Sequence, residues 1–242
     1  MGAVRAEAEA GAEWVGGGLL AARVHRRIEG GRDRAALLWR AGPGWRMAAS
    51  GVMGGGLARR DYVLNAEVDG DYRRTDPAAH LAEIAAGCGV SGDGVGLLTA
   101  ADVTRACFAE DGGVEVLATV GIGRPTWAAA DRALDEARIG APLDGNGPGT
   151  INIIVAVPAA LSDAALVNLV ATATEAKVQA LLENGYACTG TASDAVCAAG
   201  LVAGVPESAR EPFGGVRSRW GARAARAVHA AVAAGARDRP PA

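Results

Sequence analysis

The feature that most constrains the fold is a strand pattern followed by a helix pattern between residues 150 and 185. In TINIIVAV (150–157), β-branched residues recur at every second position, which predicts a strand with an apolar face. Pro158 ends this strand, and Ser162 supplies a capping oxygen for a helix that extends to about Gly185. A strand joined to a long helix in this way predicts an α/β or α+β fold.

The remaining sequence also mixes strand and helix patterns. Strands are predicted at 35–39 and 45–50, joined as a hairpin across AGPG, and at 62–68 and 114–120. Helices are predicted at 77–86, from a Thr99–Asp102 capping box to about Glu110, at 127–137 and at 219–232. We therefore expect mixed sheets packed with helices in one compact layered domain.

The 242-residue chain is long enough for one large domain with a sizeable core. Residues 1–13 lack an amphipathic pattern and are expected to fray, and 236–242 is expected to be a disordered tail. The domain itself is expected to span 14–235. IGAPLDGNGPG (139–149) is rich in Gly and Pro and either separates two halves of this domain or forms a loop over a site.

Charge and cysteine usage exclude several functions. A net charge of −3 gives no electrostatic basis for binding nucleic acid. The cysteines have no CxxC spacing and none lies beside a histidine, so we expect neither a metal site nor a bound cofactor. The cysteines are Cys88, Cys107, Cys188 and Cys197. Without a signal peptide or a membrane-spanning apolar run, a cytoplasmic protein with no membrane partner is expected, and a homo-oligomer is left open.

Lys177 is the only lysine in a chain that otherwise uses arginine. At 100° per residue, Lys177 and Thr174 fall inside the predicted apolar face of the helix, with Glu175 on its border. This face is defined by Leu166, Val167, Val170, Val178 and Leu181. Lys177 either extends to solvent or pairs with a buried carboxylate, or it supplies a compact charge to a reaction, which arginine does less well.

A polar cluster, TGTASD (189–194), follows this helix. Thr191 and Asp194 have the spacing of a capping box, with Gly190 as a turn, so they would start another helix. Capping does not account for the additional hydroxyls of Thr189 and Ser193. The alternative is that this turn presents N–H groups to an anion or a developing oxyanion.

Other residues are candidates for binding a ligand. In SGVMGGG (50–56), Gly54 and Gly55 either permit tight backbone packing or let the backbone approach a large ligand, with Ser50 beside them. Asn65 and Asn152 lie in predicted strands and either pair with neighbouring backbone or face a pocket. The sequence has no GxGxxG, P-loop or GxSxG motif, so dinucleotide, nucleotide triphosphate and α/β-hydrolase sites are not supported.

Several of these stretches together resemble one family. GTINIIVAVPAALSDAALVNLVATATEAKVQALLENG followed by TGTASDAV is similar to the adenosylcobinamide amidohydrolases of corrinoid salvage. SGVMGGGL, YVLNAEV, VGLLTAADV, GVEVLATVGIGRP and RSRWGARAARAV extend the resemblance over roughly residues 45 to 232. Ser193 stands where the family pattern has threonine, and the segment around 218–221 departs from the pattern.

The resemblance implies hydrolysis of the amide that joins adenosylcobyric acid to aminopropanol, so that adenosylcobinamide is the expected substrate and its product enters cobalamin biosynthesis. Our first hypothesis makes Glu175 the base for water and Lys177 the oxyanion partner or the acid for the amine. The catalytic candidates are Glu175, Lys177, Thr191 and Asp194. The substrate-binding candidates are Ser50, Gly54, Gly55, Asn65, Asn152, Thr174, Gly190 and Ser193.

Three alternatives stay open on the sequence alone. Thr191 is a covalent nucleophile with Lys177 as its base, or the chain cleaves itself before Thr150 or Thr191 and frees a threonine amine. A non-catalytic corrinoid carrier or sensor is the third alternative.

Overall fold

The computed structural model describes residues 13–129 and 149–238, which form two mixed β-sheets and three α-helices. The first sheet, sheet A, has the strand order β1 (Trp14–Val15), β2 (Ala22–Glu29), β3 (Arg32–Arg40), β6 (Tyr62–Glu67) and β7 (Gly94–Thr99). The second, sheet B, has the order β5 (Gly56–Arg59), β4 (Trp45–Ala49), β11 (Ala195–Leu201), β10 (Ile151–Val157), β9 (Val114–Val120) and β8 (Cys107–Asp111). The helices are α1 (Pro77–Gly87), α2 (Asp163–Glu183) and α3 (Arg219–Arg237), with short 3₁₀ turns η1 (Val103–Arg105) and η3 (Glu207–Ala209).

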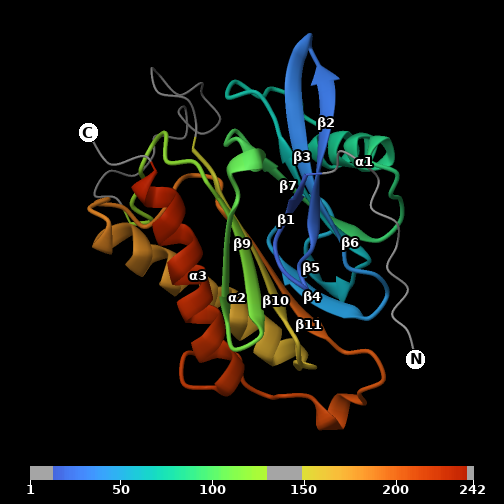
Figure 1. The fold of residues 1–242 in the computed structure, drawn as a ribbon, viewed down its shortest axis with the longest axis vertical. Coiled ribbons are helices and arrows are strands. Elements are labelled where there is room, and N and C mark those ends of the chain that lie inside the picture. The colour runs from blue at the N-terminus through green and yellow to red at the C-terminus, as the bar shows by residue number, and fades with distance from the viewer. Residues whose placement is uncertain (1–12, 130–148, 239–242) are drawn as a thin grey trace.

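These elements stack in four layers, with the two sheets face to face between the helices. Figure 1 places α1 on one side of the strands and α2 with α3 on the other. Helix α1 packs on β6 and β7 of sheet A, whereas α2 and α3 pack on sheet B. This architecture is consistent with the α/β or α+β class that the sequence predicts.

Strand β10 lies inside sheet B and explains why its sequence is apolar throughout. Ile151, Ile153 and Val155 pack in the core under α2 and α3, whereas Ile154 and Ala156 pack in the core between the sheets. All seven residues of the strand are buried. The predicted strand is confirmed, and both of its faces are covered rather than one.

The two sheets are built from units with the same connectivity. In sheet A, β2, β3 and β6 pair antiparallel in turn, and α1 then connects β6 to the parallel strand β7. In sheet B, β8, β9 and β10 pair antiparallel in turn, and α2 connects β10 to the parallel strand β11. The units are not separate, because β4 and β5 follow β3 in sequence but extend sheet B, where β4 pairs with β11 and β5 pairs with β4.

Most of the predicted elements are confirmed, and two are wrong. The strands at 62–68 and 114–120 and all three helices α1, α2 and α3 are present. The predicted hairpin is wrong because β3 and β4 belong to different sheets. Trp39 and Trp45 flank the AGPG turn and pack edge to face, with ring centroids 4.9 Å apart, in the core between the sheets. Because both rings are buried in this core, the chain passes here from sheet A to sheet B.

The predicted helix after Thr99 is also wrong. Asp102 accepts a hydrogen bond from the backbone N–H of Thr104 and begins only the short turn η1. The chain then enters β8, whose pairing with β9 replaces the helix. Of the predicted helix 127–137, residues 130–137 lie outside the described residues, as does most of the 139–149 segment.

Candidate active site

The candidate active site lies at the edge of sheet B where the parallel strands β10 and β11 begin. Helix α2 connects these two strands, so it returns across the sheet and brings its C-terminal half back to this edge. Lys177 lies in that half of α2, and Asp194 comes directly before β11. The fold thereby brings together two charged side chains that are 17 residues apart.

Lys177 and Asp194 form a buried ion pair. The Nζ of Lys177 donates to Oδ2 of Asp194 at 2.5 Å, and the two side chains are only 8% and 10% exposed. A buried charge is costly unless it is paired and hydrogen-bonded. The burial of Lys177 that the sequence predicts is confirmed, and its partner is Asp194.

The carboxylate of Asp194 also organises the turn that precedes it. Thr191 donates to it twice, from its backbone N–H at 3.1 Å and from its hydroxyl at 2.5 Å. The backbone N–H of Ile151, at the start of β10, donates at 2.9 Å. Together with the ammonium of Lys177, four donors converge on one carboxylate.

The capping-box prediction for Thr191 and Asp194 is half correct. The hydrogen bond from the Thr191 N–H to the Asp194 carboxylate is the local contact that a capping box uses. No helix follows, because residues 195–201 form β11 between β4 and β10. These side chains therefore hold a turn at the edge of the sheet.

Gly190 lies against the ion pair. A Cβ at this position would be 2.1 Å from Oδ2 of Asp194 and 2.6 Å from Nζ of Lys177, so no side chain fits. The carbonyl of Gly190 accepts from the N–H of Thr126, and the N–H of Thr189 donates to the carbonyl of Thr126. These bonds hold the 189–190 backbone against the charged pair.

A group of hydroxyl and amide side chains adjoins the pair where the two sheets face each other. The Thr150 hydroxyl lies 2.8 Å from the Ser193 hydroxyl. Asn152 donates to Oδ1 of Asn65 at 2.8 Å, and Asn65 donates to the Thr119 hydroxyl at 2.9 Å. The Oδ1 of Asn152 is buried and has no hydrogen-bond partner. A buried acceptor without a donor is an uncommon feature that fits a site for water or a ligand group.

The structure places the glycine-rich candidates in a tightly packed loop. A Cβ on Gly54 would lie 1.9 Å from the carbonyl oxygen of Gly94, and one on Gly55 would lie 2.5 Å from that of Gly51. The backbone N–H and hydroxyl of Ser50 both bond with the backbone of Val196, which prolongs the β4–β11 pairing. Close packing of the backbone is thus sufficient to account for these residues.

Glu175 and Thr174 are not brought to the ion pair. Both are exposed, and Glu175 lies about 200° around α2 from Lys177. The buried face of α2 is lined mainly by small residues such as Ala173, Ala176 and Ala180, whereas Val167 is 54% exposed. The predicted apolar face is centred on large residues such as Val167. It is therefore rotated around the helix relative to the face that is buried.

Thr150 and Thr119 were not among the predicted substrate-binding or catalytic residues. Only one signal in the sequence pointed to Thr150, the Gly149–Thr150 dipeptide before the strongest strand, which raised the question of self-cleavage. Thr119 had no such signal, because its partner Asn65 comes from the other sheet.

Burial disfavours the thiolate form of the cysteines. Burial raises the pKa of the Cys197 thiol to about 12, and burial also raises the pKa values of Cys88, Cys107 and Cys188. Within residues 13–129 and 149–238, no group of three or more His, Cys, Asp or Glu side chains is arranged to hold a metal ion.

None of the helices in these ranges has the length and apolar character needed to cross a membrane.

Comparison with known proteins gives one consistent result. The adenosylcobinamide amidohydrolase family matches residues 21–241. A protein named adenosylcobinamide amidohydrolase from Methanosarcina mazei is 36% identical over 152 residues, which cover 63% of this chain and 68% of that protein. A protein of the same name from Halobacterium salinarum is 36% identical over 200 residues, which cover 80% of this chain and 81% of that protein. This chain therefore belongs to the adenosylcobinamide amidohydrolase family.

Proposed function

We propose that this protein hydrolyses the amide bond between adenosylcobyric acid and aminopropanol in adenosylcobinamide. The family match and the names of the two relatives support this reaction. The structural observation that carries the proposal is the buried Lys177–Asp194 pair, which lies among hydroxyl groups at one edge of the sheet. The reaction belongs to corrinoid salvage, and its product enters cobalamin biosynthesis.

Hydrolysis of an unactivated amide has three requirements. It needs a nucleophile that loses a proton, donors for the tetrahedral oxyanion, and a proton for the departing amine. Asp194 is the proton acceptor in our proposal, because its carboxylate already receives the Thr191 hydroxyl. Lys177 supplies positive charge beside it and gives a proton to the amine. Glu175, on the exposed side of α2, takes no part in this assignment.

The substrate is large and carries many amide groups, and the polar side chains next to the ion pair match that chemistry. Ser193 is exposed, and its hydroxyl contacts the buried hydroxyl of Thr150. Beyond it lie the Asn152 and Asn65 amides. We propose that these four side chains position the substrate amide.

The decisive experiment is incubation of the purified protein with adenosylcobinamide. We expect chromatography to detect adenosylcobyric acid and free aminopropanol in equal amounts over many turnovers. A Lys177→Met variant purified in the same way is the control for a contaminating hydrolase. Tight binding of one adenosylcobinamide per chain without release of aminopropanol would instead support a corrinoid carrier or sensor.

We also propose that the protein acts in the cytoplasm, where a corrinoid taken up by the cell is available for repair. Cell fractionation followed by the hydrolysis assay tests this location. Activity recovered mainly with the membrane or the extracellular fraction would contradict it.

A further inference from the structure

The peptide bond between Gly149 and Thr150 lies at the start of β10, an inner strand of sheet B. Thr150 comes directly before β10, in the interior of sheet B, and is only 4% exposed. Its hydroxyl is 2.8 Å from the hydroxyl of Ser193. In any peptide a threonine hydroxyl can reach the carbonyl carbon of the residue before it, so the Gly149 carbonyl is an electrophile available to Thr150.

The backbone around this bond is tightly enclosed. A Cβ on Gly149 would lie 2.3 Å from the carbonyl oxygen of Gly121 and 2.5 Å from the backbone nitrogen of Gly123. The carbonyl of Thr150 accepts a hydrogen bond from the N–H of Gly121 at 3.0 Å. The residue before Thr150 therefore has no side chain, lies against the backbone of Gly121 and Gly123, and is followed by a carbonyl that Gly121 holds.

Groups that can move protons lie one peptide unit away. Asp194 accepts the N–H of Ile151, the residue after Thr150, and it is paired with Lys177. Ser193, which contacts the Thr150 hydroxyl, is the neighbour of Asp194 in sequence. The turn at 190–194 thus places a hydroxyl and a carboxylate at the start of β10, and Lys177 of α2 adds an ammonium bonded to that carboxylate.

We propose that the chain cleaves itself between Gly149 and Thr150. The Thr150 oxygen attacks the Gly149 carbonyl carbon, and its proton passes through the Ser193 hydroxyl, which lies 2.8 Å away. The C–N bond then breaks, the nitrogen keeps the electron pair and takes up that proton, and an ester joins Gly149 to the Thr150 oxygen. One water molecule hydrolyses the ester, which leaves a Gly149 carboxylate, the Thr150 hydroxyl and a free Thr150 amine.

Self-cleavage would make Thr150 an activated nucleophile. A free α-amine next to the hydroxyl of the same residue is a base adjacent to a nucleophile, an arrangement that activates threonine. Thr150, rather than Thr191, is then the residue that attacks the substrate amide, and this last step alone rests on the proposed function. Self-cleavage itself requires no substrate.

Thr191 also follows a glycine, but its environment is different. Its hydroxyl already donates to Asp194, and the preceding carbonyl of Gly190 is held by the N–H of Thr126 in a β-bridge. Thr191 therefore fixes the carboxylate, whereas the partner of the Thr150 hydroxyl is the hydroxyl of Ser193.

The test is the mass of the purified protein. We expect two chains of about 15 and 9 kDa, in proportion to the lengths of residues 1–149 and 150–242 of the 24.3 kDa chain, with the smaller beginning Thr-Ile-Asn. Thr150→Ala should stay as one chain, whereas Thr150→Ser should still cleave because it keeps the hydroxyl. Thr104→Ala, which alters an exposed hydroxyl bonded to Asp102, is the matched control and should cleave like the wild type.

The outcomes separate self-cleavage from the proposed reaction. A single 24.3 kDa chain in a preparation that hydrolyses adenosylcobinamide overturns self-cleavage and leaves the proposed function standing. Two chains in a preparation that does not hydrolyse adenosylcobinamide support self-cleavage and contradict the proposed function. Cleavage at any other bond, or equal cleavage in Thr150→Ala, assigns the cut to another residue or to a contaminating protease and also overturns the proposal. If Thr150→Ala does not fold, the terminal sequence and the Thr150→Ser variant decide.

Discussion

At the scale of single residues, the Lys177–Asp194 pair accounts for the only lysine of the chain. Removing two charges from water is costly, and their attraction offsets this cost only when the geometry is good and further hydrogen bonds complete the site. Asp194 has those bonds from Thr191 and Ile151. Such a pair is weak evidence for a purely stabilising role, and its position beside Ser193 and Thr150 favours chemistry.

Replacement of Lys177 tests this interpretation. Lys177→Met should still fold, since three donors to Asp194 remain, although breaking a buried pair costs about 3–5 kcal/mol. Hydrolysis should fall by roughly two orders of magnitude or more, the scale of one lost oxyanion donor or general acid. Lys177→Arg should not restore it, because Gly190 leaves no space for the larger guanidinium. Single-turnover hydrolysis and thermal unfolding measure both effects, and near-normal turnover in Lys177→Met would refute the catalytic role.

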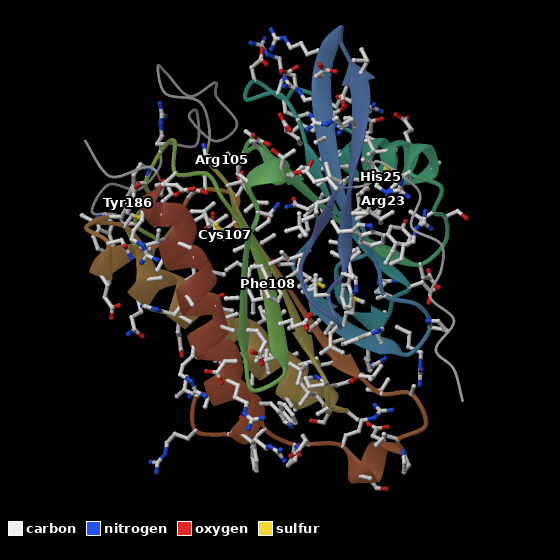
Figure 2. The ribbon with its side chains drawn as sticks, in the orientation of Figure 1. Arg23, His25, Arg105, Cys107, Phe108 and Tyr186 are labelled. Carbon is white, nitrogen blue, oxygen red and sulfur yellow. The ribbon has the colours of Figure 1, made fainter. Side chains whose placement is uncertain are left out.

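His25 makes a separate prediction about pH. It lies beside Arg23 on β2 (Figure 2). Burial, and then the charges of Arg23 and Arg40, lower the pKa of His25, whose Nε2 is buried without a hydrogen-bond partner. Below about pH 6.5 the unfolded chain gains a proton there that the folded protein resists, so the free energy of unfolding should decrease as the pH falls.

The measurement for His25 is denaturant unfolding of the wild type and His25→Leu at pH 7.5 and pH 5.5. The variant should lose less stability between these two pH values than the wild type does. Equal losses in the two proteins would show that the titration of His25 does not contribute.

The sequence predicted part of this site for physical reasons that differ by residue. The buried position of Lys177 follows from helix periodicity, and the local spacing in TGTASD relates Thr191 to Asp194. Glu175 falls on the border of the predicted apolar face, yet it is two positions from Lys177, and two positions along a helix separate the side chains by about 200°. The contacts of Thr150 with Ser193 and of Asn152 with Asn65 depend on tertiary packing and have no local signal.

At the scale of elements, the ends of α1 and α2 provide a matched comparison. Ser162 accepts the N–H of Ala165 at 3.1 Å and caps α2. Asp76 precedes α1 but makes no capping bond, because its carboxylate pairs with Arg74. Ser162→Ala should reduce the free energy of unfolding by about 0.5–2 kcal/mol. Asp76→Ala should cost less, and chemical denaturation of both variants measures the difference. An equal or larger loss in Asp76→Ala would contradict the assigned caps.

The sequence predicts every α-helix that forms in the described residues but misses several of the strands, and the reason is the range of the interactions. All three helices carry their own start signals or periodicity, including Ser162 before α2 and Pro77 at the start of α1. Strands β8 and β11 acquire their structure from partners far along the chain, so the capping boxes before them were misleading. The alternation of residues within a strand does not indicate which sheet the strand joins. For this reason the predicted β3–β4 hairpin is wrong.

At the scale of the whole molecule, sheet B combines strands from both sides of the Gly149–Thr150 bond. On one side of the bond, β8 pairs with β9 and β9 pairs with β10, and β4 pairs with β11. A chain opened at this bond, by self-cleavage or by an inserted protease site, should therefore remain one particle. Size-exclusion chromatography in native buffer should give one peak that contains both pieces, and only denaturant should separate them. Separate native peaks would contradict the pairing.

The same interleaving limits how this protein can be rearranged in evolution. The two units share a connectivity, yet β4 and β5 of the first complete the sheet of the second. Neither unit is thus a module that recombination can move alone into another protein. If the gene were divided near codon 150, both products would have to be made in the same cell, whereas fusion of a new domain at either chain end would leave the sheets intact.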